Sequence, residues 1–243
     1  MKLISHEKMM ETLDWVYEKS VDGLPGLGSA EELAQTYMKS GGTPFEQANS
    51  LIKWQKAKAG TSGFVTGLGG LMALPVTLPM NITSVLYVQI RMIAAIAHMG
   101  GYDLRDDRVK SLVYMCLIAN TGKEVLKDVG IGVGSKLALN AVKQIPGKTL
   151  TQINQKVGFR LLTKFGEKGV INLGKAIPLI GGLIGGSVDY IATNSIGKVA
   201  RDTFTPLTPN GDQISFAAND AGLQTIANES IDAPSQVATN PRR

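Results

Sequence analysis

The chain has 243 residues, of which 44% are hydrophobic, so it can bury a core as one large domain or as two small ones. Its single cysteine, Cys116, excludes a disulfide framework and a cysteine-based metal site within one chain, which suits a reducing compartment. The net charge is +5, and the positive excess lies in residues 105–204, which hold fifteen Lys/Arg against seven Asp/Glu. A basic region of this kind fits an anionic surface such as phospholipid, although a solvated protein face has the same pattern.

The first 58 residues predict three helices. Residues 5–20 have apolar side chains at three- and four-residue spacing, which is typical of an amphipathic helix. Ser29 and Glu32 have the spacing of a capping box, so a second helix is expected to begin there. Residues 43–46 repeat this pattern with proline at the first helical position, and they predict a third helix through about Lys58.

An uncharged stretch of thirty-two residues follows, from Ala59 to Ile90. Roughly 20 apolar residues would cross a membrane, but glycines, prolines and polar side chains interrupt this stretch. We therefore expect two helices broken near residues 74–79, the second running from Pro79 to His98 and ending at Gly100-Gly101. Glycines spaced four apart allow close packing either in a protein core or in lipid, and the spacing does not decide between these. The large apolar side chains expected to contact lipid here are Phe64, Leu68 and Leu71.

The second half of the chain also reads as helical. Asp106 is expected to cap a helix that runs to about Asp128. Further helices are expected over Gly130–Ile145, over Thr149–Phe165, and from the uncharged residues 176–188 to about Phe204. No run alternates strongly enough to need a strand. The predicted fold is therefore all-α, with one multi-helix domain over residues 1–204 and a polar, disordered tail over residues 205–243.

A basic stripe is predicted on the helix over Thr149–Phe165. Its cationic side chains recur at four-residue intervals and are Lys156, Arg160, Lys164 and Lys168. The stripe lies beside an apolar line formed by Val157, Leu161 and Phe165. Because basic beside apolar is the pattern of a helix at a membrane interface, we expect the stripe to meet lipid phosphates. The alternative interpretation is a surface helix whose lysines are only solvated.

Arg91 interrupts an otherwise apolar helix. A lone buried charge is costly, so Arg91 must pair, reach water or face an anionic ligand. Asp103 and Asp189 are candidate partners, and the sequence does not decide between them. We include Arg91 among the residues expected to contact lipid.

No group of residues has the spacing of a catalytic site. Ile145–Thr149 resembles the end of a phosphate-binding loop, but Val142 stands where that pattern needs glycine. His6 and His98 are too far apart to form a helical metal pair. Helix capping and local ion pairs explain the mixed charges of residues 103–108. We expect no enzyme activity, no cofactor, no metal and no nucleic-acid partner.

Several long strings in the chain are similar to the bacterial EcsC family. They are GLPGLGSAEELA, WQKAKAGTSGFVTGLGGL, LYVQIRMIAAIAHMGGYDLRDDRVKSLV, INQKVGFRLLTKFGEKGVINLGKAIPLIGG and SIGKVA. The resemblance spans about Ser5 to Phe204 and does not cover the tail. It implies a helical cytoplasmic or membrane-associated protein, in a family named from an operon that encodes an ABC transporter, and it supplies no catalytic residues.

The function expected from the sequence is therefore non-enzymatic binding to the cytoplasmic face of the inner membrane, through the apolar helices and the basic stripe. The N-terminus reaches Glu7 and Lys8 before the apolar core of a secretory signal could form, which predicts a cytoplasmic protein. The expected partner is membrane phospholipid, with a membrane transporter or another protein as a second class. Two rivals stay open, namely a carrier of lipid or another hydrophobic ligand and a membrane-perturbing, pore-forming effector. The oligomeric state is also open.

Overall fold

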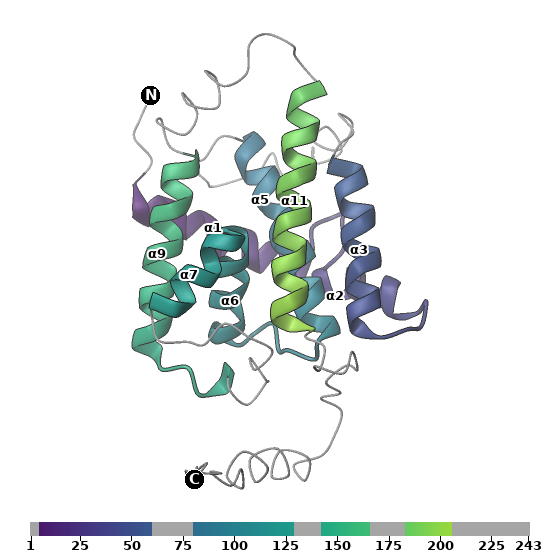
Figure 1. Ribbon diagram of the computed structural model, residues 1–243, viewed down its shortest axis with the longest axis horizontal. Coiled ribbons are helices and arrows are strands. Elements are labelled where there is room, and N and C mark those ends of the chain that lie inside the picture. The colour runs from purple at the N-terminus through teal and green to yellow at the C-terminus, as the bar shows by residue number, and fades with distance from the viewer. Residues whose placement is uncertain (1–4, 60–79, 129–141, 166–182, 206–243) are drawn as a thin grey trace, which may run out of the picture.

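The computed structural model describes residues 5–59, 80–128, 142–165 and 183–205. These residues form eight helices and no strand, which confirms the all-α prediction (Figure 1). The helices are α1 (His6–Asp22), α2 (Ala30–Met38), α3 (Pro44–Ala59), α5 (Met80–Met99), α6 (Asp107–Leu117), α7 (Asn120–Asp128), α9 (Gly147–Phe165) and α11 (Leu183–Phe204).

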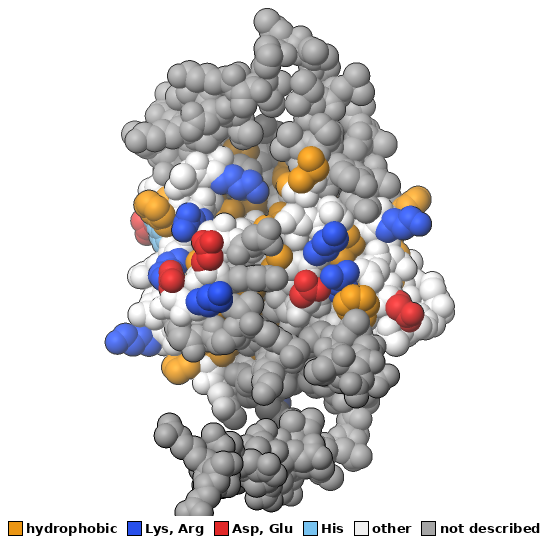
Figure 2. All heavy atoms as spheres, viewed as in Figure 1, with side chains coloured by type: hydrophobic (Ala, Val, Ile, Leu, Met, Phe, Trp, Pro, Cys, Tyr) orange, Lys and Arg blue, Asp and Glu red, His pale blue; other side chains and the backbone are white. Residues whose placement is uncertain are grey.

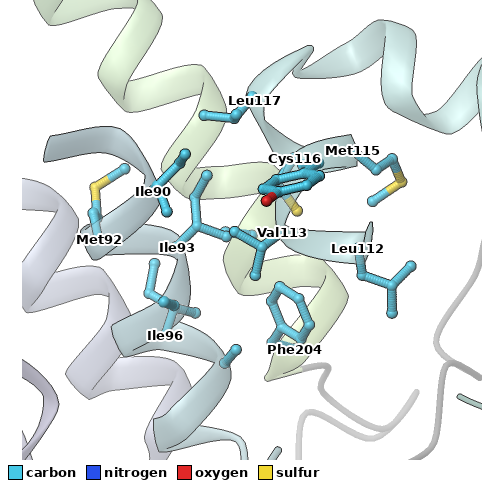
Figure 3. Packing of buried hydrophobic residues seen from close by; sticks show 14 of the residues in the cluster. Ile90, Met92, Ile93, Ile96, Leu112, Val113, Met115, Cys116, Leu117 and Phe204 are labelled. Carbon is cyan, nitrogen blue, oxygen red and sulfur yellow. The ribbon is translucent and has the colours of Figure 1, made fainter. Parts of the chain in front are cut away.

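Helix α5 lies at the centre of the bundle and packs against α1, α2, α3, α6 and α11. Ile90, Ile93 and Ile96 of α5 are fully buried. Figure 3 shows Ile93 and Val113 of α6 pointing toward one another, with Phe204 of α11 close by. Each large apolar side chain buried in this way contributes about 1.5–3 kcal/mol of transfer free energy. The second half of the uncharged stretch therefore forms a core helix.

The predicted helix starts are confirmed by their caps. Ser29 Oγ accepts the Glu32 N–H at 3.0 Å, and the Glu32 carboxylate accepts the Ser29 N–H at 2.8 Å. The same reciprocal pair joins Thr43 and Glu46 at the start of α3. Asp106 accepts the Arg108 N–H at 2.8 Å at the start of α6. These contacts satisfy amide groups that a helix N-terminus leaves without an intrahelical partner.

The glycine stop after α5 is also confirmed. Gly101 has φ of +81°, a conformation that glycine adopts without strain. Gly100 has a different role, because a Cβ built on it would lie 2.0 Å from the carbonyl oxygen of Phe204. The absence of a side chain at Gly100 lets the end of α5 contact the end of α11.

The single helix predicted from Asp107 to Asp128 is wrong. The chain forms two helices, α6 and α7, with Ile118 and Ala119 between them. Ala119 has φ of +49°, in the left-handed region that a non-glycine residue rarely adopts. The turn lets α7 pack against both α6 and α9, and Gly122 of α7 allows a close approach to the carbonyl oxygen of Met115. Neither Ile118 nor Ala119 is a glycine or a proline, so the sequence gives no sign that the helix ends here.

The other predicted boundaries are close to those observed. Helix α9 begins at Gly147, two residues before the predicted start, and α11 ends at Phe204 as predicted. The break near residues 74–79, most of the helix predicted over Gly130–Ile145, and the tail after Thr205 lie outside the described residues.

Candidate membrane-contact site

Four helix ends lie toward one end of the bundle, and the start of α11 reaches beyond the other three (Figure 1). Figure 1 shows α3 and α9 ending there and α5 and α11 beginning there. We call this the junction end and define it by Ala59, Met80, Phe165 and Leu183. The chain leaves the described bundle at Ala59 and returns at Met80, and it leaves again at Phe165 and returns at Leu183. The stretch that carries Phe64, Leu68 and Leu71 therefore starts and finishes at the junction end, although these three residues lie outside the described residues.

Of the helices that reach the junction end, α5 and α9 have no acidic residue and α3 has only Glu46, whereas α11 carries Asp189 and Asp202. The sequence has no acidic residue between Glu46 and Asp103, and only Glu167 between Asp128 and Asp189. Helix α3 carries Lys53, Lys56 and Lys58, and α9 carries Lys148, Lys156, Arg160 and Lys164 without an acidic residue. Anionic surfaces attract basic side chains grouped in this way.

Acidic side chains approach α9 from its neighbours. Helix α1, which packs against α9, exposes Glu7 and Glu11. Asp128, the last residue of α7, accepts from Lys156 Nζ at 2.8 Å. The charge of Lys156 is thus partly compensated within the protein. Arg160 and Lys164 are exposed closer to the junction end, and Lys168 lies outside the described residues.

The apolar line beside the stripe belongs to the core. Val157 and Leu161 are fully buried, as is Ile153 one turn earlier on α9, since α9 packs on α6 and α1. The side chain of Phe165 lies outside what the structure describes. The placement of this line thus gives no support for α9 lying flat with the line in lipid. Phe159, on the outer side of α9, is instead 67% exposed.

Helices α3 and α11 run antiparallel and close together. Arg201 Nη1 donates to Asn49 Oδ1 at 2.7 Å, and a Cβ on Gly197 would lie 2.7 Å from Ile52. If this register continues, Ile191 lies level with Ala59, the last residue of α3. Ile191 is 66% exposed and Trp54 is 54% exposed, so this pair of helices presents large apolar side chains toward the junction end.

Arg91 lies inside the bundle and away from the junction end. Its Nε and Nη2 donate to the carbonyl oxygen of Ser29 at 3.4 and 3.3 Å. Burial lowers the pKa of Arg91, while Tyr87 and Glu32 act in the opposite direction. The partner found here is therefore the N-terminus of α2. Asp103, one of the two predicted candidates, accepts the backbone N–H of Arg105 at 2.8 Å.

One helix in the described part of the chain is long and apolar enough to cross a membrane, by length and composition. It is the Ile82–Met99 part of α5, and 72% of it is buried inside the protein. A core helix of a soluble protein passes the same test, so this helix is weak evidence for a membrane span.

The remaining reactive side chains lie in structural contacts. His6 Nε2 lies 3.2 Å from the carbonyl oxygen of Gln155, and His98 Nε2 lies 3.9 Å from Glu31 Oε1. Burial raises the pKa of the Cys116 thiol to about 12. Within the described ranges, no three His, Cys, Asp or Glu side chains gather as a metal site.

Three exposed apolar residues were not predicted from the sequence, namely Trp54, Phe159 and Ile191. Each belongs to a helix that also buries apolar side chains in the core, so the sequence alone did not separate them from the core. The long gap between acidic residues, from Glu46 to Asp103, was a signal that could have directed attention to this end.

Comparison with protein families shows to which family the chain belongs. The model of the EcsC protein family matches residues 8–206. The chain belongs to the EcsC protein family. The resemblance seen in the sequence is thereby confirmed for nearly all of the helical part of this EcsC protein. Comparison with the curated proteins and with the solved structures finds no match.

Proposed function

We propose that this EcsC-family protein is a non-enzymatic, peripheral protein of the cytoplasmic membrane face, which binds anionic phospholipid through its junction end. One observation carries the proposal. The uncharged stretch after Ala59 leaves and rejoins the bundle at the end where Arg160 and Lys164 are exposed. A neutral apolar stretch beside basic side chains is the composition of surfaces that bind anionic membranes.

In this proposal, charge contributes most of the preference for anionic over zwitterionic membranes. A Lys or Arg near an anionic leaflet is worth about 1 kcal/mol, and salt screens the attraction within about 10 Å at 0.1 M. Binding should therefore be stronger to vesicles that contain phosphatidylglycerol than to purely zwitterionic vesicles, and it should weaken as salt is added.

The test compares two pairs of charge reversals in a vesicle flotation assay. Arg160→Glu with Lys164→Glu changes the junction end. Lys39→Glu with Lys148→Glu changes two exposed lysines away from the junction end, one directly after α2 and one at the start of α9. Both variants lower the net charge equally. We expect the first pair to weaken binding to anionic vesicles by at least about tenfold and the second pair to have a much smaller effect. Equal losses in the two variants would show that only net charge matters and would exclude the junction end.

The same vesicles separate the proposal from its two rivals. Vesicles loaded with a fluorescent dye should stay sealed when the protein binds, whereas a pore-forming effector would release the dye. Lipid extraction of the purified protein should yield no stoichiometric lipid, whereas a carrier would retain its ligand.

A further inference from the structure

One face of the bundle has side chains of different kinds mixed together. Figure 2 shows basic and acidic side chains interspersed over the described part of this face, with separate apolar side chains between them. Single exposed apolar residues of this kind are common on protein surfaces. A stronger contrast lies inside the bundle, between the two halves of α5.

The two halves of α5 bury side chains of different kinds. From Ile90 to Met99 every buried side chain is apolar. From Ile82 to Gln89 four of the five buried side chains carry a hydroxyl or an amide, and only Leu86 is purely apolar. The four are Thr83, Ser84, Tyr87 and Gln89. The half of α5 nearer the junction end, which we call its junction half, therefore packs through a more polar surface than the far half.

Helices α3 and α11 bring two more buried polar side chains to the same region. Gln55 of α3 is 6% exposed, and Thr193 of α11 is 3% exposed. The two helices run antiparallel, and a Cβ on Gly197 would lie 2.7 Å from Ile52. Counting along both helices from that contact places Gln55 level with residue 194, next to Thr193.

Gln89 lies at this level on the third helix. Helices α5 and α11 both run away from the junction end and meet where Gly100 contacts Phe204. Gln89 is eleven residues before Gly100, and Thr193 is eleven residues before Phe204. Since α3, α5 and α11 pack against one another in all three pairs, we call Gln55, Gln89 and Thr193 the polar layer. The polar layer divides the contact of the three helices into a junction half and a far half.

Two buried polar atoms in or beside the polar layer have no hydrogen-bond partner in the structure. They are Gln55 Oε1 and the hydroxyl oxygen of Tyr87, a residue that is 1% exposed. Other such atoms in the described part of the chain belong to Ser20, Gln47 and Asn154, and of these only Gln47 is on one of the three helices, near the start of α3. A buried polar atom without a partner costs the free energy of its desolvation. The packed state is therefore less stable at the junction half than its burial alone would suggest.

The far half is held by well-matched contacts. Arg91, two residues beyond the polar layer on α5, donates to the carbonyl oxygen of Ser29. Figure 3 shows the apolar packing beyond it, where Ile93 and Val113 point toward one another. Parts of a protein with few buried apolar contacts open locally, whereas tightly packed cores open only with global unfolding.

We propose that the contact of α3, α5 and α11 opens as one unit on the junction side of the polar layer, while the far half stays packed. In the open state the hydroxyl of Tyr87 and the amide of Gln55 reach water, so the cost of burying them without partners is removed. The inference goes beyond the proposed function and does not depend on membrane binding, because it assigns a second conformational state to the protein alone.

Hydrogen exchange of the full chain, measured by mass spectrometry, tests the opening. We expect residues 85–89 of α5 and residues 190–194 of α11 to have protection factors at least about tenfold lower than those of residues 93–97. The first two segments should respond equally to low concentrations of urea, since one opening exposes both. Equal protection of residues 85–89 and 93–97 would overturn the proposal. So would different responses of the α5 and α11 segments, because each helix would then fray on its own.

Two tyrosine substitutions give a matched comparison. Tyr87→Phe removes only the hydroxyl that has no partner, so it should slow exchange about fivefold in residues 85–89 and also in residues 190–194. Tyr114→Phe removes a hydroxyl that donates to Asp14 Oδ1 at 2.8 Å. This control should speed exchange in residues 93–97 about fivefold and leave the two junction segments unchanged. Faster exchange of residues 85–89 in Tyr87→Phe would show that the hydroxyl stabilises the packed state, and the proposal would be wrong.

Discussion

Arg91 of α5 donates from Nε and Nη2 to the carbonyl oxygen of Ser29, the residue whose side chain caps α2. The contact joins residues 62 positions apart and fixes the start of α2 against the central helix. Glu32, which completes the capping box of α2, lies beside the same guanidinium, since a Cβ on Gly28 would lie 2.4 Å from its carboxylate and 3.4 Å from Arg91 Nη2. Arg91, the first charged residue after the uncharged stretch, thus has a structural role.

Replacing Arg91 should loosen α2. Arg91→Gln removes the charge-assisted hydrogen bonds to Ser29, and because the group is only half-buried we expect a loss of about 1–2 kcal/mol in the free energy of unfolding. Hydrogen exchange should become faster throughout α2. Urea unfolding and exchange measured by mass spectrometry check the two effects. Arg160→Gln, at an exposed position, should change stability by less than about 0.5 kcal/mol, and an equal loss there would contradict this role of Arg91.

Two glycine-to-alanine substitutions should have opposite effects. Gly100→Ala places a Cβ 2.0 Å from the Phe204 carbonyl oxygen, so α5 and α11 must separate. We expect a loss of about 2–4 kcal/mol or failure to fold. Gly147 has no atom within 4 Å of such a Cβ and is the first residue of α9, so Gly147→Ala should stabilise the protein by about 0.5 kcal/mol. Thermal unfolding of both variants checks the prediction, which a stable Gly100→Ala protein would overturn.

Local features of the sequence predicted most helix boundaries well. The features that were not predicted depend on contacts between residues far apart in the chain. Ser29 and Glu32 are three residues apart, so their capping box could be read directly. Arg91 contacts Ser29 only because α2 folds back onto α5, and nothing near Arg91 in the chain indicates this. The sequence also left open what the apolar line on α9 packs against. Periodicity shows that Val157 faces an apolar environment, but it does not show whether protein or lipid provides that environment.

The turn between α6 and α7 was also beyond sequence reasoning. Alanine is the best helix former, yet Ala119 has φ of +49°. Packing of α7 on α9 outweighs that local preference. The strain is small enough, about 1–2 kcal/mol, for tertiary contacts to offset it.

An alanine-to-glycine substitution usually lowers the free energy of unfolding of a helical protein, but at this turn it should raise it. Ala119→Gly relieves the left-handed strain, and we expect it to raise the free energy of unfolding by up to about 1 kcal/mol. Ala192→Gly, inside α11, should lower it by about 1 kcal/mol. Chemical denaturation of the two variants under the same conditions gives the comparison. Destabilisation by Ala119→Gly would show that the turn is not strained.

Stability should fall steeply at high pH. Burial raises the pKa of Tyr17, of Tyr114 and of Tyr102, the last to about 12, from an ordinary value of 10.0. Between about pH 10 and 12 the unfolded chain releases these protons while the folded protein keeps them, so unfolding is favoured as the pH rises. Each tyrosine contributes about 1.4 kcal/mol per pH unit in that window.

Urea midpoints measured from pH 8 to pH 11 check this dependence, and absorbance of tyrosinate reports the ionisation. Tyr102→Phe should reduce the slope above pH 10 by the share of one tyrosine, whatever it does to stability at neutral pH. A slope equal to that of the wild-type protein would mean that Tyr102 ionises normally in the folded state.

Binding to anionic membrane, on which the proposed function of this EcsC protein depends, is measured by flotation of the wild-type chain with phosphatidylglycerol vesicles. We expect the protein to rise with these vesicles at low salt, to rise less as salt is added, and to stay at the bottom of the gradient with zwitterionic vesicles. A protein that stays at the bottom with both kinds of vesicle at low salt would contradict the proposed function.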